Sequence, residues 1–97
     1  MGITVVVEFR TKPGVRAELK SVLEGISGSY AAGLPGFLGS TVYEQLDDPD
    51  GLVEIAEWET SEAQATAVER AAASGVYAPV MELLVAPIRA TRIGHLT

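Results

Sequence analysis

The stretch of residues 36–58 most constrains the fold, because it predicts a β-hairpin. It contains two β-forming runs, Phe37–Leu46 and Leu52–Trp58, on either side of the acidic cluster DDPDG. Pro49 fixes its own φ, the aspartate side chains can bond nearby backbone amides, and Gly51 accepts a positive φ. The pattern therefore predicts two antiparallel strands joined by a five-residue loop at residues 47–51.

The second strand of this hairpin has two chemically different faces. Side chains alternate along a strand, so one face carries Leu52, Glu54, Ala56 and Trp58, and the other carries Val53, Ile55, Glu57 and Glu59. An unpaired buried charge is costly, so an acid on an apolar face reaches solvent, finds a partner or lines a cavity. Two interpretations stay open: a cavity lined by Glu54 and Trp58, or an acid near an open edge beside a purely structural tryptophan.

The remaining chain predicts one strand and one helix before the hairpin. Ile3–Phe9 is nearly continuous in apolar β-formers, which is typical of a strand buried on both faces. From Val15 the period changes, and apolar residues fall on one helical stripe. The stripe comprises Val15, Leu19, Val22, Leu23, Ile26 and Tyr30.

After the hairpin the sequence predicts a helix in two pieces and a last strand. Thr60 or Ser61 is a suitable N-cap for the alanine-rich helix Ala63–Ala73. The inward stripe of this helix is expected to comprise Ala63, Ala67, Val68 and Ala71. A short segment over residues 76–84 and the strand Ile88–Gly94 follow. The β-α-β-β-α-β order predicts an α+β, ferredoxin-like fold, with a four-stranded antiparallel sheet and helices on one face.

Composition restricts the assembly and the partners. Ninety-seven residues with 47% apolar residues predict one domain over residues 1–97 that hides part of its apolar surface in a subunit contact. We therefore expect a homodimer that docks sheet to sheet. The net charge is −6 and the seven basic residues are scattered, which argues against nucleic acid as a partner. With no membrane-length apolar run and no signal-peptide pattern, a cytoplasmic protein without a membrane partner is expected.

The chain resembles the antibiotic biosynthesis monooxygenase family. The resemblance rests on Lys12-Pro13-Gly14 after the first strand, Pro35-Gly36-Phe37-Leu38-Gly39 and Tyr43-Glu44 around the second, Asp48-Pro49-Asp50 in the loop, and Glu57-Trp58 before Thr60-Ser61-Glu62-Ala63. It spans about residues 3–94. It implies a dimeric α+β barrel and a cofactor-independent monooxygenase that oxidises an aromatic polyketide or a quinol-like substrate. A polyketide cyclase or isomerase of the same fold, and a non-catalytic dimer that binds a hydrophobic small molecule, are the alternatives.

The resemblance also suggests site residues. Trp58 matches a pocket tryptophan of the oxygenases, whereas Glu54 stands where they have an asparagine. Haem degradation of the family's kind is not expected, because the chain has no asparagine and its one histidine is His95. The same scarcity of histidine and the absence of cysteine argue against a metal site.

The candidate catalytic residues are Trp58 and Glu54, and no cofactor is expected. Burial beside Trp58 would raise the pKa of Glu54 and suit it to act as a base, whereas pairing with Arg92 or Arg89 would lower it. The candidate substrate-binding residues are Tyr30, Tyr77, Arg92 and His95. Either tyrosine could donate a hydrogen bond to a substrate oxygen, or could simply belong to the core.

Overall fold

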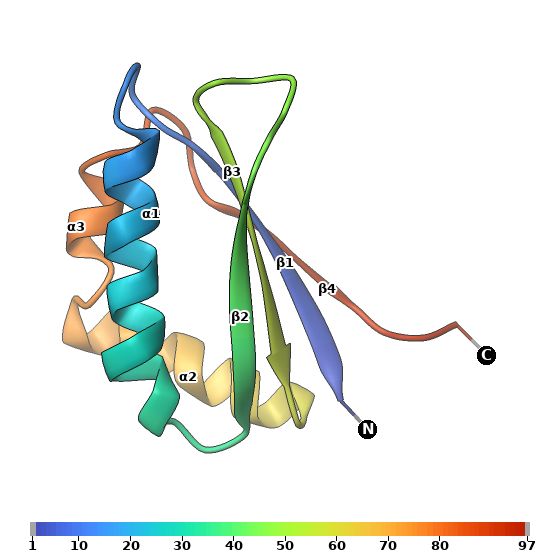
Figure 1. Ribbon diagram of the computed structural model, residues 1–97. Helices are drawn as coiled ribbons and strands as arrows, with labels where there is room; N and C mark the ends of the chain where they lie inside the picture. The colour runs from blue at the N-terminus through green and yellow to red at the C-terminus, as the bar shows by residue number, and fades with distance from the viewer. Residues whose placement is uncertain (1, 97) are drawn as a thin grey trace.

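The computed structural model describes residues 2–96 and contains a four-stranded antiparallel sheet with helices on one face (Figure 1). The strand order is β2-β3-β1-β4, so the predicted ferredoxin-like arrangement is confirmed. The strands are β1 (Ile3–Arg10), β2 (Phe37–Glu44), β3 (Gly51–Trp58) and β4 (Arg89–Ile93). The helices are α1 (Arg16–Gly25), the π-helical turn η1 (Ile26–Tyr30), the 3₁₀ turn η2 (Ala31–Gly33), α2 (Ser61–Ser74) and α3 (Ala78–Met81).

The β2–β3 hairpin has the predicted pairing but a different loop. β2 ends at Glu44, and the loop runs over residues 45–50, so the predicted continuation of the strand to Leu46 is wrong. The Leu46 side chain is 89% exposed, because the chain must leave the sheet there to form the acidic turn. Within that turn the Asp50 backbone N–H donates to the Asp48 carboxylate over 2.9 Å, as the aspartate-rich sequence predicts.

A β-bulge at Leu38 decides which residues of β2 face the helices. Pairing with β3 is regular at Phe37 and again from Gly39 onward, with Leu38 as the extra residue. One extra residue switches the facing of every position after it. Phe37 therefore packs into the core, whereas Thr41 and Tyr43 are exposed. Simple alternation along residues 37–43, without the bulge, would instead place these three side chains on one face.

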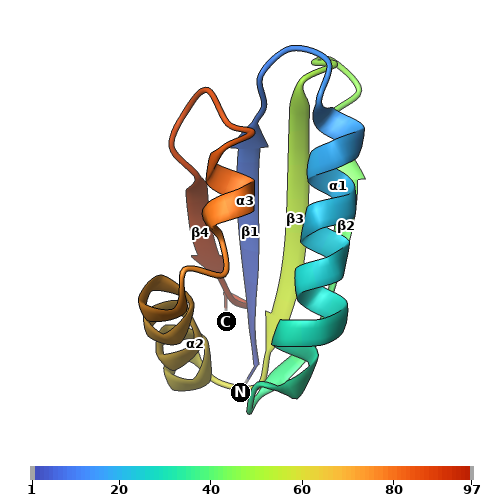
Figure 2. The same cartoon turned by 90° about the vertical axis from the view of Figure 1, so that its left-hand side faces the viewer.

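The core lies between the sheet and the helices, as Figure 2 shows with α1 in front of β3 and β2, and α3 in front of β1. The predicted inner face of β3 is confirmed, because Leu52, Glu54, Ala56 and Trp58 are all buried. One cluster of buried residues comprises Phe9, Leu19, Leu23, Leu52 and Val80, and a second comprises Val5, Ala56, Trp58 and Ala67.

Helix α2 begins and ends with the expected signals, although its inward stripe is narrower than predicted. Thr60 is the N-cap, and its hydroxyl accepts a hydrogen bond from the Ala63 backbone N–H at 3.0 Å. Ala67 and Ala71 are buried, but Val68 is 56% exposed, so its place on the inward stripe is wrong. Val68 lies one residue beyond Ala67, about 100° further round the helix, and this rotation carries it off the packed side.

The sheet face without helices is only partly covered in a single chain. Val5 and Phe9 of β1 are buried, whereas Val6 and Glu8 on the other face are half-buried. The expected burial of β1 on both faces is therefore not met within one chain, because no helix or strand among residues 2–96 covers that side (Figure 1). Within the described residues, no helix is both long and apolar enough for a membrane span.

Candidate functional site

A buried acid lies on the helix-covered face of the sheet. Glu54 is 8% exposed and occupies the middle of β3, between Val7 of β1 and Val42 of β2 in the strand register. These neighbours are apolar, and Val7 and Val42 both pack against the buried cluster beneath α1. The alternation of β3 places the carboxylate there, because inward positions 52, 56 and 58 carry apolar side chains that require this face to be buried.

Two serine hydroxyls from different elements lie in a row beside this acid. Ser27, on the π-helical turn η1, donates to a carboxylate oxygen of Glu54 over 3.4 Å. The hydroxyls of Ser27 and Ser40 lie 2.9 Å apart. Ser40 follows the β-bulge of β2, and without that extra residue it would point to the other side of the sheet.

One tyrosine of the helical layer lies near this acid, and a second tyrosine lies near the first. Burial raises the pKa of Tyr77, and the negative charges of the Glu54 carboxylate and of an ionised Tyr30 raise it further. Tyr30 ends η1, and Tyr77 directly precedes α3. Tyr77 therefore lies near both the Glu54 carboxylate and the Tyr30 phenol, and a role of either tyrosine in substrate binding stays a prediction.

Burial raises the pKa of Glu54, while the hydroxyls of Ser27 and Ser40 oppose this shift. The predicted alternative, an ion pair between Glu54 and an arginine of β4, is not formed. Arg89 lies 4.0 Å from the Glu8 carboxylate, and Arg92 donates to the Ser61 hydroxyl over 2.9 Å. The reason is topological, since β1 lies between β4 and β3.

Trp58 lies on the same face of β3 as Glu54, with Ala56 between them. Its side chain is 8% exposed and meets Phe37 edge to face, with ring centroids 5.1 Å apart and an interplanar angle of 62°. Ala67 of α2 packs against the same cluster. Trp58 is thus part of the packed core in this structure.

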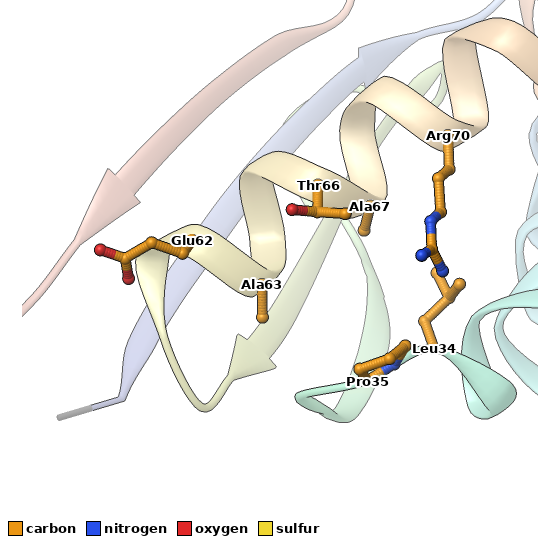
Figure 3. Close-up of a pocket in the computed structure, with 7 residues that line it drawn as sticks. All are labelled: Leu34, Pro35, Glu62, Ala63, Thr66, Ala67 and Arg70. Carbon is orange, nitrogen blue, oxygen red and sulfur yellow. The ribbon is translucent and has the colours of Figure 1, made fainter.

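A surface hollow, here called the α2 hollow, lies beside the Trp58 cluster. It has a volume of about 170 Å³ and is lined by Leu34, Pro35, Glu62, Ala63, Thr66, Ala67 and Arg70. Leu34 and Ala63 also pack against the Trp58 cluster, so the two features share a wall. Figure 3 shows the Arg70 side chain extending from α2 toward Leu34. Glu54 is not part of the lining.

Two predicted substrate contacts lie apart from the Glu54 group. Arg92 is exposed on β4 and bonded to the start of α2. His95 follows β4 and is exposed. No group of three or more His, Asp or Glu side chains within residues 2–96 is arranged to hold a metal ion.

A match to the sequence profile of a protein family shows which family this chain comes from. The sequence profile of the antibiotic biosynthesis monooxygenase family matches residues 2–75. The chain belongs to this family. A search of curated protein sequences found no match.

Solved structures of other family members have the same fold. SnoaB, a cofactor-independent oxygenase from Streptomyces nogalater, has a TM-score of 0.82 at 22% identity, covering 99% of this chain and 94% of SnoaB. A candidate antibiotic biosynthesis monooxygenase from Bordetella bronchiseptica has a TM-score of 0.85 at 14% identity, covering 99% and 98%. The protein Rv0793 of Mycobacterium tuberculosis has a TM-score of 0.80 at 22% identity, covering 100% and 97%. At these identities the similarity establishes the fold alone.

Sequence reasoning missed the two serines of the site. Ser27 had a usable signal, because it falls four residues after Leu23 and three before Tyr30 on the inward stripe of the first helix. Ser40 had none, because its inward direction depends on the bulge at Leu38. In this family member the site thus contains a carboxylate, two serine hydroxyls and two phenols.

Proposed function

We propose that this chain is a cofactor-independent monooxygenase that oxidises an aromatic polyketide or a quinol-like substrate. It would act as one domain over residues 1–97, in the cytoplasm, as a homodimer. The observation that carries the proposal is the buried Glu54, which has a raised pKa and no cationic partner among the described residues. An acid in this state suits general-base catalysis near neutral pH. Family membership and the fold shared with SnoaB supply the oxygenase context.

The proposed chemistry requires little beyond one base and an apolar environment. The Glu54 carboxylate takes a proton from an acidic C–H or O–H of the substrate, which leaves an electron-rich enolate or phenolate. This anion transfers one electron to O₂, and the two radicals combine into a peroxide anion, which takes up a proton. Loss of water from the peroxide gives the quinone, so an anthrone and O₂ become an anthraquinone and H₂O. The substrate itself supplies the electrons, and no cofactor is needed.

The remaining residues would bind and orient the substrate. Tyr77 lies near Glu54, and Tyr30 lies near Tyr77; their hydroxyls would donate hydrogen bonds to the developing oxyanion. Trp58 would form a rigid apolar wall, with the α2 hollow as the side from which an aromatic body approaches. Arg92 would contact the substrate near the start of α2, and we assign no contact to His95.

Turnover of dithranol, a tricyclic anthrone, tests this proposal. We expect oxygen consumption with the wild-type chain, and no product when oxygen is excluded. Glu54→Gln keeps the shape but removes the base, so turnover should fall by about two orders of magnitude. The matched control is Glu69→Gln, which changes an exposed acid on α2 and should leave the rate unchanged. A Glu54→Gln variant with the wild-type rate would exclude Glu54 as the base.

The pH dependence gives a second readout of the same base. Because burial raises the pKa of Glu54, the rate should rise with pH along a limb whose midpoint lies above the ordinary carboxylate range. The limb should disappear in Glu54→Gln. If product forms equally well without oxygen, the same proton transfer belongs to a cyclase or isomerase, the alternative that a buried acid also supports.

The half-buried, helix-free face of the sheet supports the proposed homodimer. Val6, Val53 and Ile55 are partly exposed there, and a second sheet would cover them. Light scattering at micromolar concentration should give roughly 20 kDa, twice the 10.2 kDa of one chain. A mass of one chain at that concentration would contradict the dimer.

A further inference from the structure

Three side-chain oxygens form a continuous line that starts at the buried acid. A Glu54 carboxylate oxygen lies 3.4 Å from the Ser27 hydroxyl, which lies 2.9 Å from the Ser40 hydroxyl. The three residues belong to β3, η1 and β2. Both serines are half-buried, so the line runs from a buried group to positions with partial access to solvent.

The number of hydroxyl protons fixes the direction of these hydrogen bonds. An ionised carboxylate only accepts, and each serine hydroxyl has one proton to donate. When Glu54 is ionised, Ser27 therefore donates to Glu54 and Ser40 donates to Ser27. When Glu54 is protonated, its own O–H can donate to Ser27, and Ser27 can then donate to Ser40. Both charge states of Glu54 are thus compatible with the same side-chain positions, and only the order of donors reverses.

Among the described groups around Glu54, the Ser27 and Ser40 hydroxyls are the ones that stabilise its negative charge. From the helical layer, Tyr77 lies close enough to Glu54 for the carboxylate charge to raise its pKa, and Tyr30 lies near Tyr77. Neighbouring strands present Val7 and Val42. The four ion pairs found among the described residues do not include Glu54. β2 is an edge strand of the sheet, so its Ser40 marks the outer end of the line.

We propose that Ser27 and Ser40 are positioning residues that form a hydroxyl relay between Glu54 and water at the β2 edge. The inference rests on the proposed role of Glu54 as the base. After Glu54 has taken the substrate proton, its O–H bond breaks as a new O–H bond forms on Ser27. The former Ser27 proton moves to Ser40, and the former Ser40 proton moves to a solvent water. One proton leaves, no electron is transferred, and both hydroxyls are restored.

Titration of Glu54 in the full chain tests the relay without a substrate. Carbon-13 NMR of labelled glutamate carboxyl groups follows each acid, and the signal missing from Glu54→Gln identifies Glu54. Ser27→Ala and Ser40→Ala should each raise the pKa of Glu54, because each removes a hydroxyl that favours the ionised form. The matched control is Ser29→Ala. Ser29 lies on the same turn but donates to the Gly25 carbonyl over 2.6 Å, and its loss should leave the titration unchanged.

A double variant separates a relay from two independent contacts. In the Ser27→Ala background, Ser40→Ala should cause no further change in the pKa of Glu54, because Ser40 acts through Ser27. Additive changes would overturn the relay, and so would a Ser27→Ala chain that titrates like the wild type. Ser27→Thr retains a hydroxyl and should restore the wild-type titration.

Kinetics with dithranol provide the functional readout. Ser27→Ala and Ser40→Ala should each lower kcat between about tenfold and a hundredfold, the loss expected for one hydrogen bond to a charged group. KM should change little, and Ser27→Thr should recover the rate. An unchanged kcat in Ser40→Ala overturns the relay. A Glu54→Gln chain with full activity would instead refute the proposed base, and the titrations would then still decide whether the hydroxyls are coupled to Glu54.

Discussion

Trp58→Ala should destabilise the fold strongly, even though family resemblance places Trp58 in a substrate pocket. The side chain is 8% exposed, contacts Phe37 edge to face at 5.1 Å and packs against Val5 and Ala67. Replacing a buried tryptophan by alanine costs about 3 to 5 kcal/mol in free energy of unfolding, because apolar burial is lost and a cavity remains. A chain of this size has roughly 5 to 15 kcal/mol in total, so about a fifth or more of its stability would be lost.

Urea unfolding followed by far-ultraviolet circular dichroism measures this loss. In thermal unfolding, the midpoint temperature of Trp58→Ala should also lie more than about 12 °C below that of the wild type. Trp58→Phe keeps an aromatic ring in the cluster and should retain most of the stability. Val68→Ala, on the exposed side of α2, is the control and should change the free energy of unfolding by less than about 0.5 kcal/mol. A Trp58→Ala chain within about 1 kcal/mol of the wild type would refute the packing argument.

Three further perturbations test other parts of the structure. Because burial raises the pKa of Glu54 above its ordinary 4.5, its contribution to stability is fully present below pH 4.5 and is lost as pH rises through the folded value. Glu54→Gln should therefore gain stability relative to the wild type between pH 4 and pH 8, by about 1.4 kcal/mol for each pH unit that separates the unfolded and folded pKa values. Urea unfolding at both pH values checks this, and a constant difference would contradict it. Thr60→Ala should lower the free energy of unfolding by about 0.5 to 2 kcal/mol, because the N-cap of α2 is lost. Thr60→Ser keeps the capping hydroxyl and should not lower it. Equal urea midpoints for the two variants would argue against the cap. Gly36→Ala should cost more than about 1 kcal/mol, because Gly36 has φ +83° and an added Cβ would lie 2.6 Å from the Ala63 Cβ; an unchanged thermal midpoint would contradict this.

The fold was predictable from sequence where packing enforces a simple period. The inner face of β3 follows from strict alternation, and the inward residues Leu19 and Leu23 of α1 follow from helical spacing. Both patterns arise because one side of each element must be apolar. The strand order then follows from the order of elements along the chain.

The site was less predictable, because two local irregularities determine it. The bulge at Leu38 reverses the facing of β2 and brings Ser40 inward. The chain changes from α-helix to π-helix at Ile26, and this π-helical turn carries Ser27 and Tyr30. A bulge or a π turn inserts one extra residue into an otherwise regular element. A search for regular spacing does not detect this extra residue.

Sequence also left the partner of Glu54 open, and the structure resolves this point. An acid on an apolar strand can pair with any cation that the fold brings near, and Arg89 and Arg92 lie on the last strand. Strand order separates them from Glu54 by one full strand. The hydroxyls beside Glu54 instead belong to Ser27 and Ser40. Serine is so common in loops and helices that its presence alone does not predict a site.

The π-helical turn Ile26–Tyr30 has a consequence for how this protein diverges from its relatives. A π turn is an α-helix that has gained one residue, so loss of Gly28 would return the helix to its regular period. Ser27 and Tyr30 would then be only two residues apart, about 200° round a regular helix, and could no longer lie on the same side of it. Leu19 and Leu23 precede the change and would keep their packing. In an aligned set of homologues, a gap of one residue at this turn should therefore accompany a change in chemistry without a change in fold.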